Sequence, residues 1–554
     1  ERPGARSRRI RLLAAASVLV LAAVGMRAAY LGTVKADDLS ARATDSNRET
    51  TTLISQRGNI VSADGRVLAT DNLSVDITAS PDIIEDPVGT AQTLGGALKL
   101  DPAEIQPKLE GDGQYAVIAK GVPVAKADAA KRLSLTGIFF TDAYERFLPG
   151  GPLAAQVIGL TSGENEGRTG LESSLDEPLT GTPGRRVRVR DAFGRTLRVP
   201  ADRDPVPGKD VTLTLDSSIQ DRVERILLDT REAYGAKSAM AIVMDPRTGA
   251  VLADATVPRY DPNQRRTINW ELTRNRPVTD QFEPGSTFKI VTMTGALADG
   301  TVTPEREFQL PAIYRLYDRE IKDSHRDYDT SMTVAQILEQ SSNVGTVKIA
   351  ETLGKERLIA WMKRFGFGSA TGIDYPGESP GYLRPSDEWY GFSIGNIPIG
   401  QGVSVTLVQL ARAYAAIANG GKLVTPHMVA KVGDEPVTPT APRAIIPPAT
   451  AAEVDQMLRK VVSADGTGIA ASVKGYEVAG KTGTAEKFDE VAGTYSDSKY
   501  TASFVGYLPA DDPQLVIAVV VDEPTAGSIY GGDVAAPAFE KIAEFATNAL
   551  RIEP

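Results

Sequence analysis

The chain has 554 residues, of which 42% are hydrophobic and 24% charged, so it is long enough for several domains and too apolar for wholesale disorder. Asp and Glu (71) outnumber Lys and Arg (61), and the formal net charge of -10 makes nucleic acid a poor candidate for the partner. With 0 Cys and 2 His, the sequence excludes disulfides, thiolate zinc sites and cysteine nucleophiles.

The first predicted element is an apolar helix close to the amino terminus. Arginine residues dominate the first positions, and apolar residues then dominate from position 12 to position 31. About 20 apolar residues cross the ~30 Å core of a bilayer, so we predict a transmembrane helix at 12–33. The arginine-rich end predicts a cytoplasmic tail at 1–11. A signal peptide cleaved near Ala23-Val24-Gly25 is the alternative, and both interpretations export the rest of the chain.

The region from residue 34 to residue 200 is predicted to be β-rich and shows no constellation of catalytic side chains. Its short alternating segments, such as residues 74–79, are typical of strands. A proline-rich charged stretch follows, so we place a linker at 201–210 and a second domain at 211–554. Strands and helices alternate unevenly in that domain, which indicates an α+β or α/β class.

The sharpest local signal is Ser286-Thr287-Phe288-Lys289, at the start of a predicted helix that follows the turn Pro284-Gly285. Lys289 lies about one helical turn from Ser286, so its amine can reach the serine hydroxyl. A lysine whose pKa is lowered by burial or by a nearby cation can act as the base for a serine nucleophile. The spacing is common by chance, and a serine at a helix start is usually an N-cap, so this motif alone leaves both interpretations open.

Two further polar motifs lie downstream. Ser341-Ser342-Asn343 follows a helical segment, and its hydroxyl and amide can face one cavity, although capping and turn residues are the common alternative. Lys481-Thr482-Gly483-Thr484 follows an apolar stretch that indicates a strand, and it offers a cation and hydroxyls to a carboxylate. The missing side chain of Gly483 lets another group lie close. The alternative is an edge strand with ordinary polar residues.

The order and separation of the three motifs make the combination specific. Ser-x-x-Lys, Ser-x-Asn and Lys-Thr-Gly, in this order, are the signature of acyl-serine penicilloyl transferases. The chain resembles class B penicillin-binding proteins, most closely the division type called FtsI, over nearly the whole exported part. Ser341-Ser342-Asn343 favours the division type, because elongation-type relatives usually carry Cys and Asp at its second and third positions. Further matching segments are Arg57-Gly58-Asn59-Ile60, Asp64-Gly65-Arg66-Val67-Leu68-Ala69, Gly170-Leu171-Glu172, Leu179-Thr180-Gly181, Gly400-Gln401-Gly402 and residues 531–539.

The resemblance implies an α+β multidomain fold. It comprises a single N-terminal transmembrane helix, an elongated β-rich pedestal of the non-catalytic dimerisation type at 34–200, and a transpeptidase domain at 211–554. The last domain is expected to be a serine β-lactamase-like α/β sandwich with an antiparallel sheet.

The resemblance also implies a role for each motif residue. Ser286 is expected to be the nucleophile and Lys289 its general base, while Ser341 joins the proton relay. Backbone N–H groups of the nucleophile and of Thr484 would form the oxyanion hole. The remaining expected site residues are Asn343 for a substrate amide, Lys481, Thr482 and Thr484 for the terminal carboxylate, and Gly483 for space along the strand.

The implied activity is that of a peptidoglycan D,D-transpeptidase in septal cell-wall synthesis, acting without metal or organic cofactor. The implied ligands are stem peptides and penicillin-type β-lactams. A SEDS-family glycan polymerase and other divisome membrane proteins are the implied partners. The implied location is the bacterial cytoplasmic (inner) membrane, in a single pass with the N-terminus inside and the catalytic domain outside.

Three alternatives remain open. The first is an elongation or sporulation transpeptidase of the same chemistry. The second is a β-lactamase, which the long pedestal and anchor disfavour because they have no use there. The third is a non-catalytic β-lactam-binding sensor or scaffold.

Overall fold

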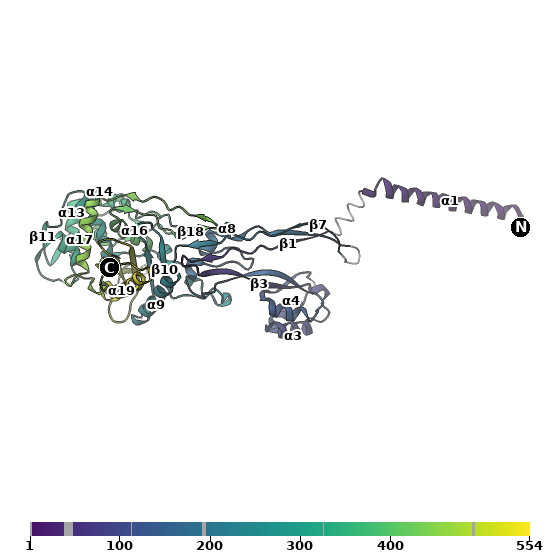
Figure 1. Ribbon diagram of the computed structural model, residues 1–554, viewed down its shortest axis with the longest axis horizontal. Helices are drawn as coiled ribbons and strands as arrows, with labels where there is room; N and C mark the ends of the chain where they lie inside the picture. The colour runs from purple at the N-terminus through teal and green to yellow at the C-terminus, as the bar shows by residue number, and fades with distance from the viewer. Residues whose placement is uncertain (1–2, 38–47, 112, 191–195, 325, 490–492) are drawn as a thin grey trace. The chain divides into compact units, whose positions relative to one another are not determined.

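The computed structural model describes every residue except 1–2, 38–47, 112, 191–195, 325 and 490–492 (Figure 1). The chain forms two compact units, one of Glu1–Gln56 with Gly181–Pro207 and one of Arg57–Thr180 with Gly208–Pro554. The region expected at 34–200 as one pedestal therefore contributes to both units, because its central part is compact with the C-terminal part of the chain.

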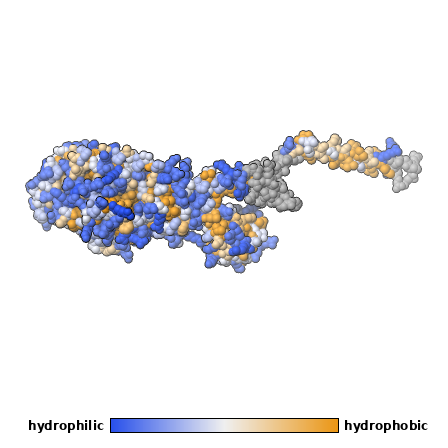
Figure 2. Space-filling model, viewed as in Figure 1, coloured by the Kyte–Doolittle hydropathy of each residue, from blue (hydrophilic) through white to orange (hydrophobic). Residues whose placement is uncertain are grey.

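The first unit begins with the long helix α1 (Pro3–Thr33). Its segment Arg8–Thr33 has 26 residues and contains an 18-residue stretch with a mean hydropathy of 2.0, so it is long and apolar enough to cross a membrane. Leu13 and Leu19 are 69% and 71% exposed, and Figure 2 shows the helix mostly in hydrophobic colours. The helix starts earlier than expected, because the arginine-rich residues assigned to a tail are good helix formers and extend it.

The first unit also contains an antiparallel sheet in the order β1 (Arg48–Leu53), β6 (Gly184–Arg190), β7 (Thr196–Arg203). The predicted linker at 201–210 therefore starts inside a strand. Pro200 is compatible with β7 because this strand lies at the sheet edge, and the register shifts between the pairs made by Arg198 and Ala201.

A seven-stranded sheet joins distant segments of the second unit, in the order β19-β18-β8-β2-β3-β4 with β5 also paired to β3. β2 (Ile60–Val61) and β8 (Val211–Leu213) run parallel, with Ile60 opposite Val211. The other pairs are antiparallel. The bounds of the other strands are β3 (Val67–Ala79), β4 (Ala116–Pro123), β5 (Ile138–Phe147), β18 (Val429–Val432) and β19 (Glu435–Pro436).

Three helices pack near β3 and β4 and form a small separate core. They are α3 (Pro87–Leu98), α4 (Pro102–Leu109) and α5 (Val124–Lys131). Leu94 and Ile105 are fully buried there with Ile77 of β3. Asp86 caps α3 by accepting from Gly89 N, and Asp101 caps α4 by accepting from Ala103 N, which fixes where both helices begin.

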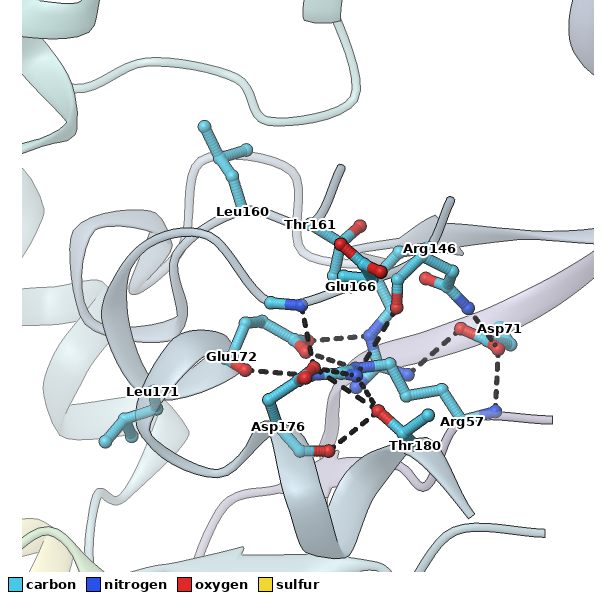
Figure 3. A network of polar contacts seen from close by, with 12 residues as sticks. Arg57, Asp71, Arg146, Leu160, Thr161, Glu166, Leu171, Glu172, Asp176 and Thr180 are labelled. Carbon is cyan, nitrogen blue, oxygen red and sulfur yellow. Dashed lines mark hydrogen bonds and ion pairs between the residues drawn. The ribbon is translucent and has the colours of Figure 1, made fainter. Parts of the chain in front are cut away.

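A buried network of charges holds β3 and β5 to α7 (Gly170–Ser174) and α8 (Asp176–Thr180) (Figure 3). Arg57 Nε and Arg146 Nε donate to the two carboxylate oxygens of Glu172 at 2.6 and 2.7 Å. Arg146 also pairs with Asp71 at 3.2 Å, and Arg57 with Asp176 at 2.6 Å. The side chains of Arg57, Arg146, Glu172 and Asp71 are at most 1% exposed, so each charge depends on its partners.

A five-stranded antiparallel sheet forms the centre of the C-terminal part, in the order β10 (Val251–Val257), β9 (Ser238–Met244), β23 (Leu515–Asp522), β22 (Thr494–Leu508), β21 (Ala479–Asp489). Every residue of β9 is buried. Its side chains alternate between two cores, with Ala241 in one and Ile242 in the other. This is the period of two that a strand with both faces covered requires.

Helices cover both faces of this sheet. On one side α9 (Ser217–Ala233) and α19 (Ala536–Leu550) share a core with the strands, and Figure 1 shows them beside β10. On the other side lie α11 (Lys289–Ala298), α13 (Asn343–Leu353), α16 (Leu407–Ala418) and α17 (Pro448–Val461). The central antiparallel sheet with helices packed on both faces, together with the mostly antiparallel sheet before it, confirms the expected α+β multidomain class.

The remaining elements are short connections around these cores. They are η1 (Pro81–Ile83), α6 (Ala155–Ile158), η2 (Arg265–Thr267), η3 (Trp270–Thr273), α10 (Arg276–Thr279), η4 (Gly285–Phe288), β11 (Glu307–Leu310), β12 (Ile313–Leu316), β13 (Arg319–Lys322), β14 (Thr330–Thr333), α12 (Val334–Glu339), α14 (Lys355–Arg364), β15 (Tyr382–Leu383), η5 (Ser386–Glu388), α15 (Ser393–Asn396), η6 (Ile397–Ile399), β16 (Val403–Ser404), β17 (Lys422–Leu423), β20 (Arg443–Ala444), η7 (Ile469–Ala471) and α18 (Gly531–Val534).

Candidate active site

Ser286 lies in η4, the single turn that leads into α11, as the Pro-Gly turn predicted. Gly285 has a φ of 54°, in the left-handed region that favours glycine, and its N–H donates to Gly400 O at 3.1 Å. A Cβ at Gly285 would lie 2.9 Å from Thr484 O, so this close approach to β21 requires glycine. Ser286 is the N-cap of neither η4 nor α11, so the capping interpretation does not account for it.

Lys289 is fully buried below this turn. Its Nζ donates to Ser341 O at 2.6 Å, to Ser341 Oγ at 3.3 Å and to Asn343 Oδ1 at 2.8 Å. The expected contact with Ser286 is not among its hydrogen bonds in this structure. Burial lowers the pKa of Lys289 to about 7, against the opposing charge of Asp323, so a large neutral fraction exists near neutral pH.

The Ser341-Ser342-Asn343 turn combines both roles considered for it. Ser342 is the N-cap of α13 and accepts from Gly345 N at 2.9 Å, which is the capping function. Ser341 has a φ of 56°, and this left-handed conformation accompanies its contact, and that of Asn343, with the Lys289 amine. The middle residue therefore builds the turn and the outer two contact the lysine.

Lys481, Thr482, Gly483 and Thr484 lie on β21 as predicted, and among the described residues β21 is an edge strand that pairs with β22 alone. Lys481 is fully buried, and burial together with the charge of Lys289 lowers its pKa well below the usual range. Thr482 Oγ1 lies 2.8 Å from Thr467 Oγ1, and Thr484 Oγ1 accepts from Gly531 N at 3.1 Å.

Gly483 leaves room for the protein itself. A Cβ there would lie 2.3 Å from Ser503 Oγ, 2.9 Å from Thr287 Cγ2 and 3.0 Å from Pro284 O. The glycine predicted to admit a close neighbour thus lets β21 pack against the turn that carries Ser286.

These motifs meet at one cleft of about 380 Å³. Ser286, Ser341, Asn343, Thr482 and Thr484 line it. Lys289, Lys481 and Gly483 are buried and are not among its lining residues. The structure thus brings together three motifs that are far apart in the sequence, with a serine and hydroxyls at the surface and two amines of lowered pKa in the interior.

Comparisons with known proteins agree with this geometry. Residues 239–544 match the family model of the penicillin binding protein transpeptidase domain, and residues 52–213 match that of the penicillin-binding protein dimerisation domain. A probable peptidoglycan D,D-transpeptidase PenA of Neisseria meningitidis is 35% identical, with 100% of this chain and 95% of the relative covered. Peptidoglycan D,D-transpeptidase FtsI of Escherichia coli is 33% identical, with 99% and 92% covered.

The chain belongs to the penicillin-binding protein family. It is a transpeptidase of the serine acyl-transfer type, as its motifs predicted. Among solved structures, penicillin binding protein 3 of Mycobacterium tuberculosis in complex with aztreonam superposes with a TM-score of 0.72, at 30% identity, covering 91% of this chain and 98% of that one. Stage V sporulation protein D of Bacillus subtilis is 32% identical, with 97% and 85% covered.

Asp323 helps to hold the site of this penicillin-binding protein together and was not predicted from the sequence. The Asp323 carboxylate accepts from Asn343 N at 2.6 Å, from Val344 N at 3.0 Å and from Ser342 Oγ at 2.8 Å. It also pairs with Arg326 at 2.9 Å, and both side chains are less than a tenth exposed. Asp323, which is not part of the three motifs, therefore fixes the conformation of the Ser341-Ser342-Asn343 turn. No sequence signal indicated it, because it follows a short hairpin 20 residues before Asn343.

Other lining residues of the cleft were also missed as site residues. The Thr467 hydroxyl makes a hydrogen bond with the Thr482 hydroxyl, and Gly531 N donates one to the Thr484 hydroxyl. Gly531 belongs to a segment that carried the family resemblance, so its position could have been expected, whereas Thr467 lies in a connection with no motif.

Proposed function

We propose that this penicillin-binding protein is a peptidoglycan D,D-transpeptidase that crosslinks stem peptides through a Ser286 acyl-enzyme. The observation that supports this most strongly is the buried amine of Lys289, whose pKa is lowered to about 7 one helical turn from Ser286. Such an amine can take the hydroxyl proton, which an ordinary lysine, protonated at neutral pH, cannot do.

The proposed reaction has two acyl transfers. Ser286 Oγ attacks the carbonyl carbon of the D-Ala-D-Ala bond, Lys289 takes the hydroxyl proton, and the oxyanion is held by the N–H groups of Ser286 and Thr484. The hydrogen bond of Lys289 with Ser341 supports a path for that proton to the leaving D-Ala amine. An amine of a second stem peptide then attacks the ester carbonyl carbon, the bond from that carbon to Ser286 Oγ breaks, and the amine proton passes to Ser286 Oγ.

The edge of β21 supports binding of an extended peptide. An added strand gains main-chain hydrogen bonds from β21. Lys481, Thr482 and Thr484 offer the charge and hydroxyls for the terminal carboxylate, and Asn343 offers its amide to the peptide. β-Lactams would bind in the same place, because their reactive carbonyl carries a neighbouring carboxylate.

The decisive test uses the full-length protein in detergent. Benzylpenicillin should add covalently to Ser286, as located by mass spectrometry of peptide digests, and Ser286→Ala should show no adduct while its thermal unfolding is unchanged. A stable adduct on the alanine variant would overturn the assignment of the nucleophile.

We infer a role in septal synthesis, supported by the similarity to FtsI and by Asn343 at the third motif position. The similarity to a sporulation protein favours the second candidate, a sporulation transpeptidase of the same chemistry. Depletion should give filaments for division and normal growth with defective spores for sporulation, whereas rounded cells would indicate elongation. Crosslinking of lipid-II-derived glycan by the protein is the result that would exclude the alternative of a non-catalytic sensor.

The proposed setting is the cytoplasmic membrane, with α1 as a single-pass anchor and its arginine-rich end inside. A pedestal at 34–200, a linker at 201–210 and a catalytic domain at 211–554 would then lie outside. A SEDS-family glycan polymerase and other division proteins are the proposed partners. Accessibility of single cysteines introduced at positions 4 and 37 to a membrane-impermeant thiol reagent tests the orientation, since only position 37 should react in intact cells.

A further inference from the structure

A second cavity of about 860 Å³ adjoins the active-site cleft. Three chain segments pass between the two. On each segment, residues one or two positions apart line different cavities. Glu283, Gly402 and Ala485 line the second cavity, and Gly285, Gln401 and Thr484 line the cleft. The second cavity therefore begins where the active-site cleft ends.

The wall between them consists largely of backbone. Gly285 N donates to Gly400 O at 3.1 Å. A Cβ at Gly400 would lie 2.1 Å from Gly285 O, so no side chain fits between these segments. Glu283 Oε1 links two segments of this wall to each other, because it accepts hydrogen bonds from Gly402 N at 2.9 Å and from the Tyr495 hydroxyl at 3.0 Å.

Two opposite charges of the second cavity have neither a hydrogen bond nor an ion pair among the described residues. Most charged residues that line it are paired, as Arg276 is with Asp280 at 2.8 Å and Lys487 with Asp522 at 2.7 Å. Within the described part of the chain, the side chains of Arg384 and Glu486 make no hydrogen bond or ion pair. The Arg384 guanidinium lies over the Tyr390 ring, 5.8 Å from its centroid. The cavity thus presents one cation and one anion to a ligand.

The rim of the second cavity is aromatic. Tyr382, Tyr390 and Phe488 line it and are 44%, 57% and 53% exposed. Phe488 is held by an edge contact with Tyr495, at 5.7 Å between ring centroids. Large exposed rings grouped around a cavity are typical of a binding site, because they add apolar contact at little entropic cost.

We propose that the second cavity binds the part of the donor stem peptide that precedes D-Ala-D-Ala, with a peptide carboxylate on Arg384 and a peptide ammonium group on Glu486. This inference rests on the proposed function, in which the donor pairs with β21. A peptide with its terminal carboxylate at Thr482 and its reacting carbonyl at Ser286 continues along the strand past Thr484. Its next residues then lie beside Ala485 and Glu486, which line the second cavity.

The test measures how well a soluble stem pentapeptide ending in D-Ala-D-Ala protects the full-length protein from benzylpenicillin. The readout is the pentapeptide concentration that halves each variant's own acylation rate, followed by intact-protein mass. Arg384→Ala should raise this concentration about tenfold, the usual effect of losing one charge-assisted hydrogen bond, and Glu486→Gln should raise it severalfold. Arg315→Ala, an exposed arginine outside both cavities, should not change it.

A second peptide identifies the contact. The carboxylate to be amidated is the one that precedes D-Ala-D-Ala, and the terminal carboxylate stays free. Amidation should weaken protection of the unmodified protein about tenfold. It should weaken protection of Arg384→Ala no further, because the amidation and the substitution remove the same interaction. Additive losses, or equal protection of all variants, would overturn the inference.

Two further results have distinct meanings. If Arg384→Ala and Glu486→Gln bind the donor normally but lose transfer to an acceptor amine, the cavity holds the acceptor and the inference is wrong. If the pentapeptide protects no variant although benzylpenicillin acylates Ser286, the inference is again wrong while the proposed nucleophile stands. Absence of acylation at Ser286 would instead overturn the proposed function.

Discussion

The buried amine of Lys289 donates a 2.8 Å hydrogen bond to the side-chain oxygen of Asn343, 54 residues further along the chain. This contact orients the amide, because Asn343 Nδ2 then donates to Lys322 O at 3.0 Å. In the proposed mechanism these are the catalytic lysine and the substrate-binding amide. Each therefore fixes the position of the other, and a substitution at one changes the orientation of the other.

Lys289→Arg should abolish acylation by benzylpenicillin. Arginine keeps the positive charge but stays protonated in proteins, so it supplies no neutral amine. We expect a loss of at least about 100-fold in the acylation rate, the usual effect of removing a general base, measured by intact-protein mass. Thermal unfolding is the control for folding. An acylation rate close to that of the unmodified protein would show that the base is another group.

The acylation rate should rise with pH and reach half its maximum near pH 7. In the proposed mechanism the neutral form of Lys289 is the active one. Its pKa is lowered to about 7, so activity is gained as pH increases through this value. The charged groups at this site are Lys481 from β21, Asp323 with its partner Arg326, and Asp533 of α18. Rates with benzylpenicillin between pH 5 and pH 9 test this.

Asp323→Asn should move that pH profile to lower pH. The Asp323 carboxylate raises the pKa of Lys289 against the effect of burial, and its removal lets the amine lose its proton at lower pH. The maximal rate should also fall, since the Ser-x-Asn turn loses a charged acceptor for three hydrogen bonds. Asp318→Asn, an exposed change on the same hairpin, is the matched control. A lower rate with an unmoved profile would limit Asp323 to a purely structural role.

Gly483→Ala should lower both stability and acylation. Its Cβ would lie 2.3 Å from Ser503 Oγ and 2.9 Å from Thr287 Cγ2, so β21 must move away from the turn of Ser286. We expect a loss of about 1–3 kcal/mol in the free energy of unfolding, typical of overpacking. Adding Ser503→Ala should recover part of it, because the closest contact is removed. Gly96→Ala in α3 meets open space and should instead stabilise the protein by about 0.5–1 kcal/mol.

Glu172→Gln should destabilise the protein by about 3–5 kcal/mol, the range for breaking a buried ion pair. The variant leaves the Nε groups of Arg57 and Arg146 without the carboxylate that both now contact. Glu166→Gln is the matched control, because its pair with Arg168 is more than half exposed and should contribute less than about 1 kcal/mol. Equal losses in chemical denaturation would show that the network adds little to stability.

Local elements were predictable from the sequence where the chain pattern itself determines them. The turn and helix at Ser286 follow from Pro284-Gly285, and β21 follows from its apolar start. The alternation of strands and helices indicated an α+β or α/β class, whereas the multidomain architecture and the meeting of the three motifs came from the family resemblance. The roles of the individual site residues stay predictions until variants are measured.

Long-range pairings could not be predicted. The parallel pairing of β2 with β8 brings Ile60 beside Val211, so residues 57–180 belong to one compact unit with the C-terminal part of the chain. Asp323 was missed for the same reason, since its acceptor role exists only after β12 and β13 form a hairpin that places it at the start of α13.

The edge of β21 that binds the peptide in the proposed mechanism is also a place where the protein can aggregate. An edge that accepts an extended peptide has the unpaired backbone groups that a strand of any other molecule can use, including β21 of a second copy. Charged residues near the end of the strand, Glu486, Lys487 and Asp489, oppose such pairing between like edges. The part of β21 next to Ser286 has no exposed charged side chain, so aggregation of the concentrated protein should begin there. A β-lactam bound covalently to Ser286 should block this part of the edge and keep the protein soluble.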